Sequence, residues 1–221
     1  MTDKLILDAC CGSRMFWDDH NNPDVLYVDN RILKCEAIWT SSNGKSKRYC
    51  NVLPDIRADF TNLPFADEFF VHIVFDPPHL LKIGANAWMA KKYGRLPDGK
   101  WRQMIHDGFA ECWRVLKTNG TLIFKWNQTD IDFNTVFDVI GRRPLYGHIC
   151  GKSKNTIWAA YVKLPKDVAI REEREAYEID KADETNCNYG AGRRNSRDEA
   201  IYAHNRVARA VMAKTEERIE K

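Results

Sequence analysis

A short apolar run that ends in an acid and two prolines constrains this chain most. Residues 69–75 are almost all β-branched or aromatic, which is typical of a buried strand. Pro77 and Pro78 cannot donate backbone hydrogen bonds, so the strand must end at Asp76. In an open α/β sheet, ligands bind at the carboxyl ends of central strands. A plain strand-ending turn is the alternative, because Asp-Pro turns are common.

Acids also end three earlier segments that we predict to be strands. These segments cover residues 5–7, 25–28 and 54–58, and the acids that follow them are Asp8, Asp29 and Asp59. Because the carboxyl ends of parallel strands meet at one edge of a sheet, the four acids are expected to line the same edge. Single acids at strand ends arise by chance, but four in succession favour a ligand site.

The segment after Asp8 is built from small residues. Ala9, Cys10 and Gly12 leave room for a ligand to approach the backbone closely. Only one glycine of the usual glycine-rich pattern is present, so the support comes from its place after the first strand. Asp29 follows Asp8 by 21 residues, a spacing that suits a carboxylate holding ribose hydroxyls.

The second half of the chain alternates helices and strands. Helices are predicted over residues 101–116 and 133–140, and they are followed by Thr118-Asn119-Gly120 and by Gly141. Three more strands are predicted over residues 121–126, 145–150 and 156–163. This order of elements predicts an α/β fold.

Two loops carry an excess of positive charge. Between residues 80 and 105 there are six basic residues, one acid and three Trp or Tyr rings. From this segment we assign five residues to the substrate: Lys91, Lys92, Arg95, Trp101 and Arg102. Such a loop suits a polyanion with stackable bases, although a solvated loop has the same composition. Residues 40–49 are predicted to be a second basic loop, with a turn at Asn43-Gly44.

The composition excludes several classes of protein. With 221 residues, 44% hydrophobic and 29% charged, the chain has the content of a soluble domain plus an appendage. No apolar run approaches the roughly 20 residues that cross a bilayer, and residues 1–4 leave no room for a signal peptide. Seven cysteines without a C-x-x-C pair favour neither zinc nor a disulfide framework. We therefore expect no metal, no membrane partner and a cytoplasmic location.

The composition changes after residue 164. Basic and acidic residues are nearly balanced there, and aromatic residues are few. Ser196 and Glu199 form a capping box that predicts a helix. We predict one domain over 1–164 and a charged helical extension over 165–221. The extension would pack loosely on the domain or join two chains as a homodimer, and disorder is the alternative.

In this order, the motifs resemble those of class I S-adenosylmethionine-dependent methyltransferases. The most specific parts are Asp76-Pro77-Pro78-His79 and Arg114-Val115-Leu116-Lys117, which runs through Gly120 into the next strand. The resemblance covers about residues 4–163. It is greatest for small methyltransferases carried by phages and prophages, and for amino-methyltransferases of nucleic-acid bases. It implies a Rossmann-like fold: a seven-stranded, mostly parallel sheet with an antiparallel last strand and helices on both faces.

The resemblance also implies roles for the residues of the first turn. Asp8 and Gly12 would line the methionine end of the cofactor, S-adenosyl-L-methionine, with Ala9 and Cys10 between them. Arg14 stands where the family usually has glycine. It would either meet the carboxylate of the cofactor or crowd the pocket.

Further roles are implied for the later strand ends. Asp29 would hold the ribose hydroxyls, Asp59 would accept from the adenine amino group, and Phe60 would pack on the adenine ring. His79 stands where the amino-methyltransferases carry Tyr, Phe or Trp.

The chemistry implied at Asp76 follows from the target. An exocyclic amine on a base is a poor nucleophile because its lone pair is delocalised into the ring. Asp76 and the carbonyl group of Pro77 would accept its N–H groups and stabilise the positive charge that develops on nitrogen. His79 would stack on the base, which we favour, or take the leaving proton. A base inside a duplex would have to be flipped out.

Three functions fit the sequence. The leading one is methylation of a base nitrogen in nucleic acid, DNA or RNA. The second keeps the cofactor but places the target amine on a protein or a small molecule. The third is a non-catalytic nucleic-acid-binding module whose cofactor site is degenerate.

Overall fold

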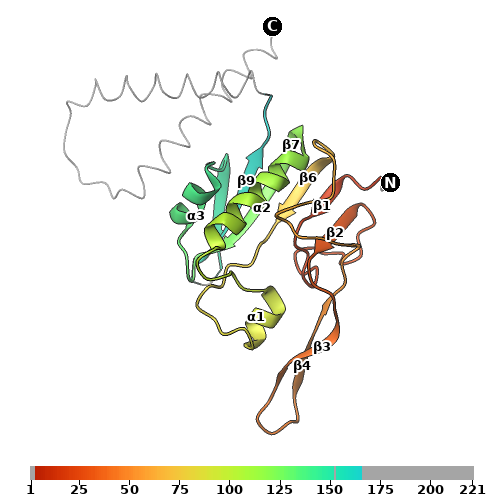
Figure 1. Cartoon of the computed structure of the whole chain (residues 1–221), viewed down its shortest axis with the longest axis vertical. Helices are drawn as coiled ribbons and strands as arrows, with labels where there is room; N and C mark the ends of the chain where they lie inside the picture. The colour runs from red at the N-terminus through yellow and green to blue at the C-terminus, as the bar shows by residue number, and fades with distance from the viewer. Residues whose placement is uncertain (1–2, 152, 166–221) are drawn as a thin grey trace, which may run out of the picture. The chain divides into compact units, whose positions relative to one another are not determined.

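A seven-stranded sheet organises the structure, a computed structural model that describes residues 3–151 and 153–165. In spatial order its strands are β5 (Ile56–Arg57), β2 (Val25–Asp29), β1 (Ile6–Asp8), β6 (Phe70–Phe75), β7 (Leu116–Asn127), β9 (Thr156–Val162) and β8 (Tyr146–Cys150). Neighbouring strands are parallel except at β9, which runs antiparallel to both β7 and β8. The predicted Rossmann-like fold class, with an antiparallel last strand, is confirmed (Figure 1).

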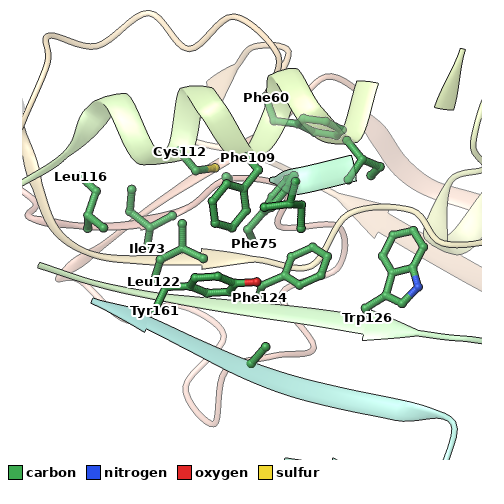
Figure 2. Close-up of a cluster of buried hydrophobic side chains, with 14 of the residues drawn as sticks. Phe60, Ile73, Phe75, Phe109, Cys112, Leu116, Leu122, Phe124, Trp126 and Tyr161 are labelled. Atoms are coloured by element: carbon green, nitrogen blue, oxygen red, sulfur yellow. The ribbon is translucent and has the colours of Figure 1, made fainter. Parts of the chain in front are cut away.

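Two helices cover one face of this sheet, α2 (Trp101–Val115) and α3 (Phe133–Ile140) (Figure 1). The buried residues of α2 recur at helical spacing, as the sequence predicts. Figure 2 shows Phe109 of α2 among the sheet residues Phe75, Phe124 and Tyr161. The α3 helix begins at the Asp132 cap, whose side chain accepts from the Thr135 N–H, and ends at Gly141 in a left-handed conformation.

The opposite face carries no helix within residues 3–151 and 153–165, which corrects the expectation of helices on both faces. The chain between β1 and β2 covers part of it with Phe16, whose ring lies 4.6 Å from that of Trp158, and with Trp17, which packs edge-on against Tyr27. Side chains in this segment bond to the backbone two residues on, as Asp19 does to the Asn21 N–H. Such local bonds compete with helix formation.

A hairpin connects β2 to β5 and consists of β3 (Leu33–Thr40) and β4 (Lys47–Val52). A loop was predicted over residues 40–49, but residue 40 belongs to β3 and residues 47–49 belong to β4, so the prediction was wrong at both ends. The turn at Asn43-Gly44 is present, and the φ angle of Gly44 is 71°. The Ser41 hydroxyl accepts from the Ser46 N–H and donates to Asn43, which closes the turn locally.

Two further boundaries differ from the sequence interpretation. The α2 helix ends at Val115 and passes directly into β7, so Thr118-Asn119-Gly120 forms an irregularity inside that strand. The left-handed residue expected there is Asn119, whose φ angle is 65°. The short helix α1 (Trp88–Tyr93) interrupts the basic segment after Asp76.

Other expectations concern residues beyond Pro165. The predicted helical extension and the homodimer contact through it lie outside the described residues. None of the helices within the described ranges is long and apolar enough to cross a membrane.

Candidate active site

A cavity of about 210 Å³ opens at the carboxyl ends of β1 and β6. Seven of the predicted site residues line it: Asp8, Cys10, Gly12, Asp76, Pro77, His79 and Lys92. The structure therefore brings together the predicted cofactor turn and the predicted catalytic turn. Arg31, Phe16 and Lys125 also line the cavity, although the sequence analysis assigned them no role.

Asp8 ends β1 and is almost completely buried, with 2% of its surface exposed. Its carboxylate accepts from the Trp17 indole N–H at 2.7 Å and from the Cys10 backbone N–H at 3.3 Å. Burial raises the pKa of Asp8 to about 7, and the charges of Asp76 and Asp29 contribute to the rise. Asp8 therefore gains or loses its proton close to neutral pH.

The turn after Asp8 presents backbone to the cavity. Gly12 has a φ angle of 50°, and an added Cβ would meet nothing closer than the Arg31 guanidinium at 3.9 Å. Burial raises the pKa of the Cys10 and Cys11 thiols, so both remain protonated and neither is an activated nucleophile. The turn is suited to binding rather than to covalent chemistry.

Asp76 ends β6 and points a carboxylate at the cavity with 29% of its side chain exposed. Its Oδ2 atom lies 2.6 Å from the Lys125 ammonium group. No partner is recorded for Oδ1 in the part of the chain that the structure describes. Asp76 therefore keeps an oxygen that can accept an N–H from a ligand.

Lys125 comes from β7, the neighbour of β6, and the sequence analysis missed it. Its ammonium group lies 6.0 Å from the Phe16 ring centroid and 5.8 Å from that of Trp158. The sequence did contain a signal for its orientation, because successive side chains of a strand point to opposite faces of the sheet. Leu122, Phe124 and Trp126 face the core, so Lys125 must face the other way.

His79 is held over the site by the segments around it. Its ring lies edge-on to Trp126 at 6.3 Å. Asp130 accepts from the backbone N–H groups of Leu81 and Lys82, at 2.7 and 2.9 Å, which fixes the turn after His79. Burial lowers the pKa of His79, so the ring is neutral at pH 7. A neutral, packed ring is suited to stacking on a planar ligand.

Pro78, which also belongs to the predicted catalytic turn, is not among the residues that line the cavity. It meets Gly94, the residue that ends α1 with a φ angle of 78°. A Cβ at Gly94 would lie only 2.9 Å from the Pro78 Cγ atom. The end of α1 is therefore seated directly against the catalytic turn.

Asp29, the predicted ribose ligand, has only 4% of its surface exposed. Its Oδ1 atom accepts from the Arg31 backbone N–H at 2.9 Å and from the Arg31 side chain at 3.0 Å. Its Oδ2 atom accepts from Arg31 and from the Gly12 N–H, both at 3.0 Å. Arg31 rather than Asp29 lines the cavity, and it reaches the carbonyl groups of Lys91 and Lys92 at 3.4 Å.

Three predicted cofactor residues lie apart from the cavity. The Arg14 guanidinium lies 3.9 Å from the Tyr27 ring centroid and donates to the Leu53 carbonyl, so it faces away from the predicted carboxylate. Asp59 accepts from the N–H and hydroxyl of Thr61. Phe60 is buried beside Phe75, which makes it a core residue in this structure (Figure 2).

The predicted substrate residues are also divided. Lys92 lines the cavity and Lys91 is exposed beside it, whereas Arg95 pairs with Asp98 at 3.0 Å. Trp101 is buried in the core with 6% of its surface exposed, and the Arg102 guanidinium lies 4.5 Å from its ring centroid. Ala9 is also buried.

The residues present fit the methionine end of S-adenosyl-L-methionine. Asp8 can carry negative charge towards a cationic group, and the Gly12 turn leaves space for it. At the ribose end, Arg31 would have to release Asp29 before hydroxyl groups could bind there. Within the described ranges, no three His, Cys, Asp or Glu side chains are grouped to hold a metal ion.

Comparison with known proteins gives distant structural likeness only. No family model and no curated protein matches the chain. The PH0226 protein from Pyrococcus horikoshii OT3 is 14% identical, with a TM-score of 0.43, over 72% of this chain and 81% of that one. A candidate S-adenosyl-L-methionine-dependent methyltransferase from Methanococcus maripaludis is 15% identical, with a TM-score of 0.30, over 50% of this chain and 54% of that one. Likeness at this level carries no argument about activity.

Proposed function

We propose that this protein is an S-adenosyl-L-methionine-dependent methyltransferase that acts on an exocyclic base nitrogen of nucleic acid, with DNA adenine N6 or cytosine N4 as the leading target. One observation carries the proposal. The Asp8–Gly12 turn and the Asp76–His79 turn line the same cavity, at the carboxyl ends of β1 and β6. Two adjacent strands thus supply a place for a cationic cofactor and an acceptor for an amine.

The cofactor would supply a methyl group on a positively charged sulfur. Asp76 accepts an N–H of the target amine through its Oδ1 atom, while Lys125 holds Oδ2 and fixes the carboxylate. Pro77 lines the same cavity, and its backbone carbonyl group would accept a second N–H. These acceptors would orient the nitrogen lone pair and stabilise the positive charge that develops on it.

His79 completes the amine side as a ring that stacks on the target base. Its position over the cavity, its contact with Trp126 and the burial that lowers its pKa all support a neutral ring. The proton lost from nitrogen would pass to solvent, since the cavity is open.

The test combines calorimetry with methyl transfer. The full chain is expected to bind S-adenosyl-L-methionine and to transfer a labelled methyl group to DNA oligonucleotides. Mass spectrometry of the digested nucleosides identifies the modified base, and RNA oligonucleotides, proteins and small amines serve as parallel substrates. Methyl transfer to RNA, a protein or a small amine instead of DNA would support the proposed methyltransferase activity and change the proposed substrate.

A second candidate function rests on the Asp29–Arg31 pair. Arg31 donates to both carboxylate oxygens of Asp29 and so occupies the position that the resemblance assigns to the ribose. This favours a nucleic-acid-binding module that holds no cofactor. Absence of any calorimetric signal with S-adenosyl-L-methionine would support this reading and exclude the enzyme.

A further inference from the structure

The hairpin of β3 and β4, residues 33–52, extends away from the seven-stranded sheet (Figure 1). It carries four basic residues and one acid: Lys34, Lys45, Lys47, Arg48 and Glu36. Lys34, Lys45 and Lys47 are exposed, and none of them is paired with a carboxylate in the described part of the chain. The hairpin, called the basic arm below, is thus a positively charged projection.

The basic arm is joined firmly to α1. The Arg48 guanidinium lies 5.2 Å from the Trp39 ring centroid and 4.9 Å from that of Trp88, between the hairpin and the start of the helix. Beneath this contact Trp88 packs on a small core that includes Ile38 and Cys50. Arg48 is therefore a structural link, while the lysines nearer the turn remain available to a partner.

The other end of α1 reaches the cavity. Lys92 and Tyr93 line the cavity, and Arg31, just before β3, bonds to the carbonyl groups of Lys91 and Lys92. The Ser13 hydroxyl also lies 3.2 Å from the Cys50 sulfur, which ties β4 to the cofactor turn. The basic arm thus has a fixed position relative to Asp76.

We propose that the basic arm and α1 form the nucleic-acid-binding surface, on which lysines hold the phosphate backbone while the target base reaches Asp76. This rests on the proposed function and names the element that selects a polyanionic substrate. Unpaired lysines attract phosphates, and the exposed rings of Trp39 and Tyr49 offer faces for unpaired bases. The lysines of the basic arm have an alternative role, because lysines on edge strands prevent unwanted pairing with other sheets. That role would not make nucleic-acid binding depend on salt.

The experiment measures oligonucleotide affinity of the full chain by fluorescence anisotropy between 50 and 200 mM salt. Single-stranded DNA, duplex DNA and RNA are separate arms, and they identify the source of the phosphates. In Lys45→Ser/Lys47→Ser the slope of log affinity against log salt should flatten by about 1.4 to 1.8, the contribution of roughly two phosphate contacts. The matched control is Lys117→Ser/Arg142→Ser, which removes two positive charges from β7 and from the segment after α3, outside the basic arm, and should keep the parent slope.

Melting temperature verifies that each variant is folded, and Lys45→Gln/Lys47→Gln repeats the test with longer side chains. Equal slopes in the arm variants and the parent would overturn the proposal, as would equal flattening in the control. Failure of the parent to bind any oligonucleotide would also overturn it and point to an acidic protein partner. A flattened slope in a protein that transfers no methyl group would support the arm while refuting the proposed function.

Discussion

Asp29 and Asp76 both stand at the end of a predicted strand in the sequence, but their carboxylates differ in exposure and in hydrogen bonding in the structure. Asp29 is the last residue of β2 and Asp76 directly follows β6, and both strands lie beside β1. Asp29 is 4% exposed and its oxygens accept four hydrogen bonds from Arg31 and Gly12, whereas Asp76 faces the cavity with Lys125 on one oxygen. Of the two acids, only Asp76 keeps a carboxylate oxygen to which the described part of the chain supplies no donor.

The residues that follow each acid account for the difference. The Arg31 N–H, two positions after Asp29, donates to its carboxylate in the local pattern that Asp residues favour. Two positions after Asp76 stands Pro78, which has no N–H to donate. The Pro-Pro pair therefore does more than end the strand, because it keeps local donors away from Asp76.

The largest expected effect comes from Asp76→Asn, which removes the feature that distinguishes Asp76. The amide brings N–H donors that would repel the target amine in one orientation. We expect methyl transfer to fall by about 10²–10³, or about 2.7–4 kcal/mol, with cofactor affinity near that of the parent. Single-turnover rates and calorimetry measure the two quantities, and Asp138→Asn on α3 is the control. A rate close to the parent's would exclude Asp76 as the acceptor.

Asp8 lies on β1, between β2 and β6, and it should make the free energy of unfolding depend on pH. Its pKa is about 7 in the folded chain against an ordinary value of 3.8, so between these pH values only the folded state holds the proton. The stabilising contribution is complete below about pH 4 and is lost as pH rises through 7. Over this pH range, we expect the free energy of unfolding of the parent to fall by about 2–4 kcal/mol relative to that of Asp8→Asn. Urea unfolding at several pH values measures it, and parallel pH curves would contradict the assignment.

Asp29→Ala tests whether the buried carboxylate serves the fold, the cofactor or both. Loss of charged hydrogen bonds should weaken cofactor binding by about 1.5–3 kcal/mol and lower the free energy of unfolding as well. Arg31→Met separates the roles, since it frees Asp29 while keeping a long side chain. If Asp29 holds the ribose, cofactor affinity should rise in Arg31→Met. It should fall when Asp29→Ala is combined with Arg31→Met. Unchanged affinity in Asp29→Ala would remove the ribose assignment.

Pro78→Ala makes Asp76 more like Asp29. It introduces an N–H two residues after the acid, where it can bond to the free oxygen and compete with the target amine. A rate loss of roughly ten-fold is expected, the value of about one hydrogen bond to a charged group. Pro78→Ala should retain cofactor affinity, and a rate equal to the parent's would show that local donors do not matter here.

The smallest effect is expected for His79→Phe. A ring that acts by stacking can be replaced by another ring, so the rate should change less than about three-fold, a loss below ~0.7 kcal/mol. The parent should show no loss of rate as pH falls through about 6.5, since burial places the pKa of His79 below that value. An inactive His79→Phe enzyme that still binds both ligands would assign His79 to proton transfer instead.

The sheet was predictable from the sequence because its strands are short apolar runs with clear ends. Val25–Asp29 and Phe70–Phe75 are largely buried, and no other element fits such runs. The hairpin was harder to predict, because most of Leu33–Thr40 is exposed and the alternation of apolar and polar residues stops at Ala37.

The site was predictable where a residue faces the cavity directly from a strand end, as Asp8 and Asp76 do. It was not predictable where a residue faces the cavity from within a strand, with no breaker directly after it to mark the position. Lys125 meets Asp76 only because β7 lies beside β6. Phe60 and Trp101 belong to the hydrophobic core, where sequence alone does not distinguish an aromatic core residue from a ligand contact.

The contact between Gly94 and Pro78 has a consequence for how this chain can diverge. A side chain at position 94 is excluded twice, by the left-handed backbone and by the proline ring 2.9 Å away. Gly84, with nothing near it and an ordinary backbone, is under neither constraint. We therefore expect any side chain at position 94 to displace the turn after Asp76, whereas a side chain at position 84 should leave that turn in place.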